Sequence, residues 1–125
     1  MRSKVLVTFS LLLVAMALTV TGEVLLKVGM NRIGDQFALT PRMLVYAFSH
    51  WQVFFGFVLI FSGSLFWLYV ISRFDLSYAY PLLAFNYVLI LIPSWFLLGE
   101  QVTRNKVIGS LIIVLGVIVV TWRGK

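Results

Sequence analysis

The stretch VLVTFSLLLVAMALTVTGEVLLKVGM, residues Val5–Met30, decides the fold class, because its first eighteen positions carry no charge. A helix needs roughly 20 mostly apolar residues, with a range of about 17–25, to cross the hydrocarbon core of a bilayer. Three further charge-free runs follow at Trp51–Ser72, Leu76–Gly99 and Val107–Trp122. We therefore predict an all-α integral membrane protein whose four transmembrane helices cover about residues 5–30, 52–72, 76–98 and 107–122.

The composition agrees with this class. Of the 125 residues 62% are hydrophobic, which is more than a soluble domain carries, and the formal net charge is +6. Basic residues beside the runs suit anionic lipid headgroups, and no basic patch is large enough to bind nucleic acid. The first run resembles a signal peptide only in its basic start, because it continues into Glu23 and Lys27 without a small-residue cleavage site. Without long linkers, we predict a single transmembrane domain over residues 1–125.

The segment between the first two spans predicts a short helix of its own. Thr40 and Pro41 are typical of an N-cap followed by the first helical residue. The aromatic residues Tyr46 and Trp51, with His50 between them, suit the headgroup region. We predict an interfacial helix over residues 41–50 that leads into the second span.

The third span contains Pro81 and Pro93, and a proline inside a helix removes a backbone hydrogen bond and kinks it. Kinked helices in membranes often line cavities, where the freed carbonyls find partners. Tyr80 and Tyr87 are seven residues apart and share a helix face, with Asn86 beside them. We predict that this face lines a cavity.

Two spans each contain a pair of glycines seven residues apart, which leaves one helix face without bulky side chains. Gly56 and Gly63 form such a pair in the second span, and Gly109 and Gly116 form another in the fourth. Small residues allow a neighbouring helix to approach closely. The neighbour is either another helix of this chain or a helix of a second subunit, and the spacing supports both alternatives.

Glu23 and Lys27 are placed four residues apart at the end of the first span, so they can form an ion pair on one helix face. Thr19 extends the same stripe one turn deeper. One alternative puts both charges at the membrane surface. The other has Glu23 face a polar cavity, since carboxylates within membranes usually serve transport. A pair at a cavity mouth suits a zwitterionic ligand, with Glu23 binding an amine and Lys27 a phosphate.

Other chemistries find little support. The chain has one histidine, no cysteine and four acidic residues, most of them in predicted loops. It contains no Ser/His/Asp arrangement, P-loop or dinucleotide fingerprint. We therefore expect no enzyme, no cofactor and no metal site.

Three stretches resemble the drug/metabolite transporter superfamily. LSYAYPLLAFNYVLI, Leu76–Ile90, is similar to the third helix of the small bacterial subunits that flip aminoarabinose-phosphoundecaprenol. GEVLLK, Gly22–Lys27, is similar to the end of their first helix. LLGEQVTRNKVIGSLIIVLGVIVV, Leu97–Val120, resembles the closing pattern of the superfamily. The resemblance covers essentially the whole chain and implies a four-helix half-transporter, similar to the small multidrug resistance proteins, that dimerises.

The resemblance also implies roles for single residues. Tyr80, Pro81 and Asn86 match the third-helix motif and are implied cavity residues, as is Lys27, while Glu100 matches the GE of the superfamily and is implied to have a structural role at a helix end. Glu23 departs from the pattern, because the flippase subunits are expected to have a neutral residue there. Aligning Lys27 with the lysine of the small multidrug resistance proteins places their essential glutamate on Thr19.

These observations lead to a functional hypothesis with two rivals. We expect a subunit that moves a polyprenyl-phosphate-linked aminosugar across a bacterial inner membrane, as a homodimer or as a heterodimer with a related four-helix subunit. Its headgroup cavity would be lined by Thr19, Glu23, Lys27, Tyr80, Asn86 and Tyr87. The first rival is proton-coupled export of small organic cations or metabolites, with Glu23 as the shared site. The second is a membrane scaffold that transports nothing.

Overall fold

The computed structural model describes residues 2–122, and every regular element in that range is an α-helix. The elements are α1 Arg2–Ile33, α2 Pro41–Phe48, α3 Trp51–Arg73, α4 Leu76–Leu83, α5 Phe85–Phe96 and α6 Arg104–Thr121. Because α4 and α5 together form one span, four segments are long and apolar enough to cross a membrane: Ser3–Ile33, Trp51–Arg73, Leu76–Phe96 and Arg104–Thr121. The predicted all-α fold with four spans is confirmed, and residues 1 and 123–125 lie outside the described part.

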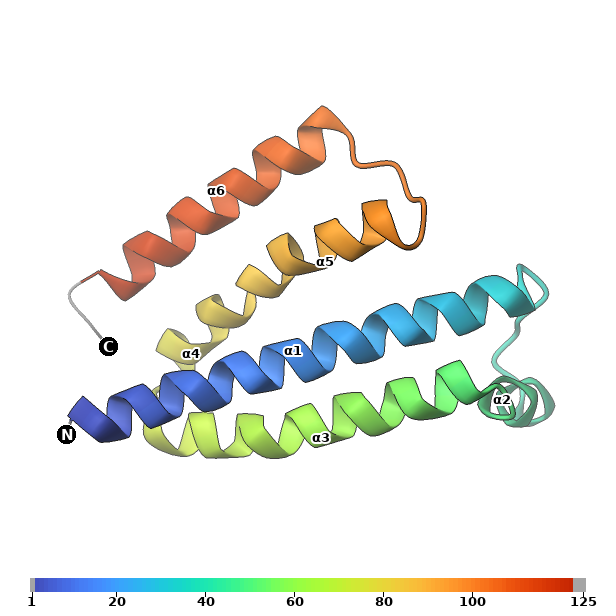
Figure 1. The fold of residues 1–125 in the computed structure, drawn as a ribbon, viewed down its shortest axis with the longest axis horizontal. Coiled ribbons are helices and arrows are strands. Elements are labelled where there is room, and N and C mark those ends of the chain that lie inside the picture. The colour runs from blue at the N-terminus through green and yellow to red at the C-terminus, as the bar shows by residue number, and fades with distance from the viewer. Residues whose placement is uncertain (1, 123–125) are drawn as a thin grey trace.

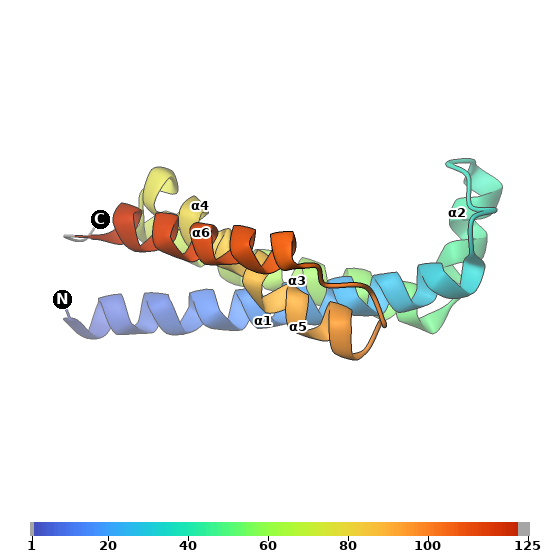
Figure 2. The ribbon, with the colours of Figure 1, turned by 90° about the horizontal axis from the view of Figure 1, so that it is seen from above.

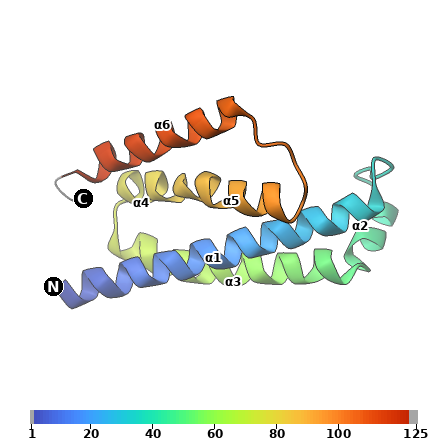
Figure 3. The same ribbon diagram turned by 45° about the horizontal axis from the view of Figure 1, so that its top comes forward.

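The spans run back and forth along one long axis (Figure 1). α1 and α3 pack side by side, and α4 and α5 lie between this pair and α6 (Figure 1; Figure 3). The start of α1 and the end of α6 lie at the same end of the bundle. This arrangement leaves α6 as an outer helix, with Ser110 as its one buried residue.

Capping side chains and left-handed glycines decide where the helices end. α1 continues to Ile33 and stops at Gly34, whose φ of 85° places it in the left-handed region and whose N–H bonds to the carbonyl of Met30 at 2.9 Å. α6 begins at Arg104, before the predicted start, because the hydroxyl of Thr103 accepts a hydrogen bond from the N–H of Lys106 at 3.3 Å.

The short helix α2 has the predicted cap. The hydroxyl of Thr40 accepts a hydrogen bond from the N–H of Met43 at 3.2 Å, and Pro41 is the first helical residue. α2 crosses the ends of α1 and α3 steeply (Figure 2). It exposes Leu44, Val45, Tyr46 and Phe48 while Ala47 is buried. Its location at a membrane interface stays a prediction.

The contact between α1 and α3 depends on glycine. A Cβ atom added to Gly22 would lie 2.6 Å from the carbonyl oxygen of Gly56, and one added to Gly56 would lie 2.8 Å from the carbonyl oxygen of Gly22. At Gly63 an added Cβ would meet the carbonyl oxygen of Ala15 at 3.1 Å. Of the two alternatives for the glycines of the second span, the structure therefore has them packing within the chain, where both are buried.

The third span is interrupted one turn after its first proline. The N–H of Ala84 bonds to the carbonyl of Pro81 at 3.0 Å, and the N–H of Tyr87 bonds to the carbonyl of Ala84 at 3.0 Å, so the chain briefly follows the tighter three-residue spacing. This interruption separates α4 from α5 where the sequence predicted one kinked helix over residues 76–98. Pro93 lies in the last turn of α5.

Candidate functional site

A polar cavity of about 240 Å³ lies where α1, α3 and the third span meet. We call it the central cavity. Its lining residues come from all three spans and are Ala15, Thr19, Glu23, Gly63, Ser64, Trp67, Leu83 and Asn86. Thr19 and Glu23 are one helical turn apart on α1, and Asn86 follows the interruption at Ala84. Three of the residues predicted for the site are thus brought together by the fold.

Asn86 holds a buried polar atom that has no partner among the described protein groups. Its side-chain oxygen Oδ1 is buried, and it accepts no hydrogen bond from a described protein group. The hydroxyl groups around it turn back to their own helices: Thr19 donates to the carbonyl of Ala15, and Ser64 donates to the carbonyl of Ile60 at 3.1 Å. A buried polar atom without a partner costs about 1–3 kcal/mol, so Oδ1 lowers the stability of the isolated chain while it stays unpaired.

Glu23 also borders a second cavity of about 300 Å³ between α1, α5 and the loop that follows. We call it the mouth cavity. It is lined by Glu23, Val24, Lys27, Ile90, Ser94, Leu98 and Glu100. Glu23 is exposed in the isolated chain and is the one residue that lines both of these cavities.

Lys27 forms its ion pair with Glu100 rather than with Glu23, which corrects the predicted pairing. The distance from Lys27 Nζ to Glu100 Oε2 is 3.8 Å, and it is the one ion pair among the described side chains. Gly99 has a φ of 67°, which turns the chain after α5 so that the N–H of Glu100 bonds to the carbonyl of Ser94 at 2.9 Å. Both side chains are about half exposed in the isolated chain, so the pair stabilises the fold by only about 0–1 kcal/mol.

Glu100 was expected only to have a structural role at a helix end. Its backbone hydrogen bond has this role, but its carboxylate also lines the mouth cavity and a third cavity of about 230 Å³. We call the third one the loop cavity. Its lining includes Tyr87, Ser94, Glu100, Gln101 and Lys106. The sequence analysis did not predict Lys106 as a site residue, because in the sequence it is only a basic residue before the fourth span. In the structure its ammonium group donates a hydrogen bond to the carbonyl of Gln101 at 2.9 Å, and this contact depends on the conformation of the loop.

Tyr80 and Tyr87 do not share a cavity, contrary to prediction. Tyr87 lines the loop cavity, whereas Tyr80 is 61% exposed and lines none of the cavities named above. The interruption at Ala84 lies between them, so the seven-residue spacing of a continuous helix does not hold. Tyr80 packs instead on Trp67, with ring centroids 6.1 Å apart, and Trp67 is part of the wall of the central cavity.

The groups gathered here suit a ligand that carries both charges. No three His, Cys, Asp or Glu side chains in the described part of the chain lie close enough to hold a metal ion. Two carboxylates and two ammonium groups instead line adjoining cavities beside four membrane-spanning segments. These features define a multi-pass membrane protein with charged side chains around cavities between its helices.

The chain matches the EamA-like transporter family over residues 4–122 and belongs to this family. The superfamily resemblance found in the sequence is thereby confirmed.

Among curated proteins, the chain is 39% identical over 74 residues to a "probable 4-amino-4-deoxy-L-arabinose-phosphoundecaprenol flippase subunit ArnE" of Aeromonas salmonicida, covering 54% of this chain and 65% of that protein. It is 35% identical over 60 residues to proteins of the same description from Yersinia pseudotuberculosis and Yersinia pestis, covering 48% of this chain and 53% of those proteins. The match thus spans between about half and two thirds of the length of these relatives. No solved structure matches the chain.

Proposed function

We propose that this protein is a subunit of a flippase that moves a polyprenyl-phosphate-linked aminosugar across the bacterial inner membrane. The observation that carries the proposal is that Glu23 lines both the central cavity and the mouth cavity. The linings of the two cavities together contain one amide, two acidic residues and one lysine: Asn86, Glu23, Glu100 and Lys27. The relatives described as flippase subunits support the choice of substrate.

Different side chains bind different parts of the headgroup. The carboxylate of Glu23 and the Oδ1 atom of Asn86 accept hydrogen bonds from the amine and hydroxyl groups of the sugar. The ammonium group of Lys27 binds the phosphate, and Glu100 holds that ammonium group until phosphate arrives. A cavity of about 240 Å³ is below the approximate range of 300–1,000 Å³ for small-molecule sites, so one cavity alone does not enclose a sugar phosphate.

A second subunit completes the path in this proposal. α6 faces outward, and Cβ atoms added at Gly109 and Gly116 would meet nothing within 4 Å. This open small-residue face supports a contact with a second copy or with a related four-helix subunit. Alternating access then follows from rocking of the two halves about the shared cavity.

The test is transfer of an aminosugar-linked polyprenyl phosphate in liposomes, with and without a related four-helix subunit. A membrane-impermeant amine reagent measures how much headgroup has crossed. Lys27→Ala should lower the transfer rate about 30-fold, corresponding to the roughly 2 kcal/mol that one hydrogen bond to a charged group contributes. Lys4→Ala removes a lysine from the same helix outside the cavities and should leave the rate unchanged. Equal rates for both variants would remove Lys27 from the site, and no transfer by the wild type would favour a scaffold.

A second candidate function is proton-coupled export of a small organic cation. The observation that favours it is that Lys27 pairs with Glu100, so Glu23, which lines the central cavity, has no ion-pair partner among the described side chains. A carboxylate in this situation suits alternate binding of a proton and a cation. If this function holds, the wild type releases protons when a cation binds and Glu23→Gln does not. Proton release by Glu23→Gln equal to that of the wild type would exclude Glu23 as the exchange site.

A further inference from the structure

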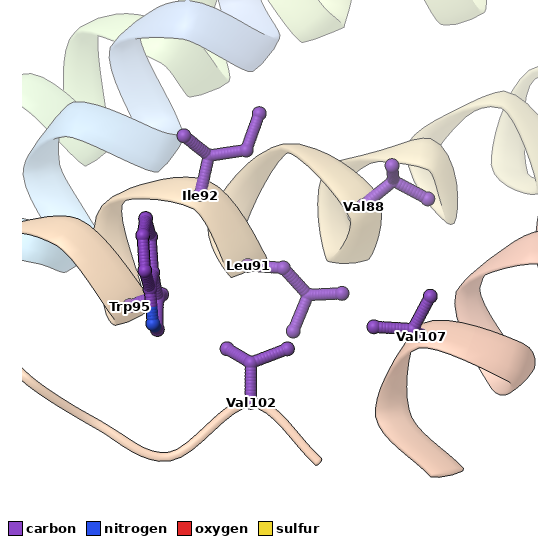
Figure 4. A pocket seen from close by; sticks show the side chains of 6 residues that line it. All are labelled: Val88, Leu91, Ile92, Trp95, Val102 and Val107. Atoms are coloured by element: carbon purple, nitrogen blue, oxygen red, sulfur yellow. The ribbon is translucent and has the colours of Figure 1, made fainter. Parts of the chain in front are cut away.

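A large apolar groove lies on the other side of α5 from the central cavity. Its volume is about 500 Å³, within the approximate range of 300–1,000 Å³ for ligand sites. α5 contributes four residues, the loop one and α6 one: Val88, Leu91, Ile92, Trp95, Val102 and Val107. Leu91, Val102 and Val107 point toward one another across the space between α5 and α6 (Figure 4). No charged side chain is among the six lining residues.

The groove adjoins the loop cavity, which in turn adjoins the mouth cavity. Leu91 and Val102 line both the groove and the loop cavity, and the loop cavity shares Ser94 and Glu100 with the mouth cavity. A ligand that spans these spaces meets charged groups at one end, from Glu100 and Lys106, and only hydrocarbon and an indole ring at the other. The sequence of linings matches a molecule with a charged head and a long apolar tail.

We infer that the groove between α5 and α6 binds the first isoprene units of the substrate's polyprenyl tail while the headgroup occupies the polar cavities. The inference rests on the proposed function, and it places the tail between α5 and α6 on its way from the headgroup to the lipid. A branched tail fits here for two reasons. Methyl branches pack between the branched side chains of Val88, Val102 and Val107, and the indole ring of Trp95 offers a flat apolar face.

The placement of the groove explains why a tail leaves on this side. α5 is the second half of the span Leu76–Phe96 and α6 is the span Arg104–Thr121, so the groove lies between two segments that are apolar enough to face lipid hydrocarbon. The contact between α1 and α3, by contrast, is closed by backbone atoms at Gly22 and Gly56, where even a methyl group does not fit. A tail attached to a headgroup in the mouth cavity therefore finds space beside α6 and none between α1 and α3.

Photo-cross-linking tests the inference with a closely matched control. The photoreactive residue p-benzoylphenylalanine replaces Val107 in one variant and Ile108 in the other. Their side chains are 45% and 47% exposed, they are neighbours on α6, and only Val107 lines the groove. Each variant is reconstituted in phospholipid liposomes containing undecaprenyl phosphate, irradiated, and weighed intact by mass spectrometry. We expect the undecaprenyl adduct at position 107 to exceed that at position 108 about tenfold, as a 1.4 kcal/mol preference requires.

Three outcomes would overturn the inference: equal undecaprenyl adducts at the two positions, phospholipid adducts alone at position 107, or cross-linking of position 107 to a second copy of the chain. Transfer of the headgroup is measured on parallel liposomes of each variant that contain the aminosugar-linked polyprenyl phosphate and the related four-helix subunit. Transfer without a preferred adduct at position 107 would refute the tail site and leave the proposed function intact. A preferred adduct without transfer would support the tail site and refute the function.

Val107→Trp provides a second test that does not need the photoreactive residue, because it fills the groove from α6. The wild type should transfer an undecaprenyl-linked substrate faster than a geranyl-linked one, and Val107→Trp should lose this preference while Ile108→Trp keeps it. An unchanged preference in Val107→Trp would refute the inference.

Discussion

Replacing Gly22 by alanine tests the close contact between α1 and α3. The added Cβ would lie 2.6 Å from the carbonyl oxygen of Gly56 and 2.8 Å from Cγ1 of Ile60. Comfortable separations are about 3.5 Å or more, so α3 must move away by nearly 1 Å along its contact. Because the first obstacle is backbone, a change of side-chain rotamer does not relieve it. Overpacking of this kind costs about 1–3 kcal/mol.

The helix itself partly offsets that cost. Alanine is favoured over glycine within a helix by roughly 1 kcal/mol, so the net loss for Gly22→Ala is about 0–2 kcal/mol. Gly109→Ala is the matched control on α6, since its Cβ would meet nothing within 4 Å. It keeps the propensity gain without the clash, and the two variants should differ by about 1–3 kcal/mol.

The assay is equilibrium unfolding in mixed micelles of dodecyl maltoside and dodecyl sulfate, followed by far-ultraviolet circular dichroism. The protein is kept dilute enough to be monomeric, so that subunit contacts of α6 do not enter the comparison. Equal free energies of unfolding for Gly22→Ala and Gly109→Ala would refute the close approach. Gly63→Ala should fall between them, because its nearest obstacle is 3.1 Å away.

Three further predictions concern the cavities and the outer helix. Asn86→Leu should raise the free energy of unfolding by about 1 kcal/mol, because it removes an unsatisfied buried oxygen. The same variant should lose headgroup binding measured by calorimetry. A destabilised variant that binds normally would contradict both expectations. A double-mutant cycle of Lys27→Met and Glu100→Gln should yield a coupling of roughly 0.2–1 kcal/mol in unfolding experiments, whereas the cycle with Glu23→Gln should yield none. Gly116→Leu should weaken dimerisation measured by analytical ultracentrifugation without lowering monomer stability, and an unchanged dissociation constant would place the subunit contact elsewhere.

The sequence by itself determined the membrane class, the four spans and several helix ends. Charge-free runs of this length fit only the hydrocarbon core, because bilayer thickness sets helix length regardless of how the helices pack. The cap formed by Thr40 and Pro41 was predictable for a similar reason, since capping involves only residues within one turn. The neighbourhood of Thr19 and Glu23 followed from helix geometry alone.

Only the tertiary structure decided which groups from different spans meet. The spacing of Glu23 and Lys27 permitted a pair, but the partner of Lys27 is Glu100, placed there by the left-handed turn at Gly99 after α5. The spacing of Tyr80 and Tyr87 assumed a continuous helix, which the interruption at Ala84 removes. Helical periodicity fixes which residues share a face of one helix. Which other helix packs against that face depends on helix interruptions and loop dihedral angles at distant positions in the sequence. The glycines of α3 show the same division, because their spacing revealed a close contact and only the packed structure showed that α1 makes it.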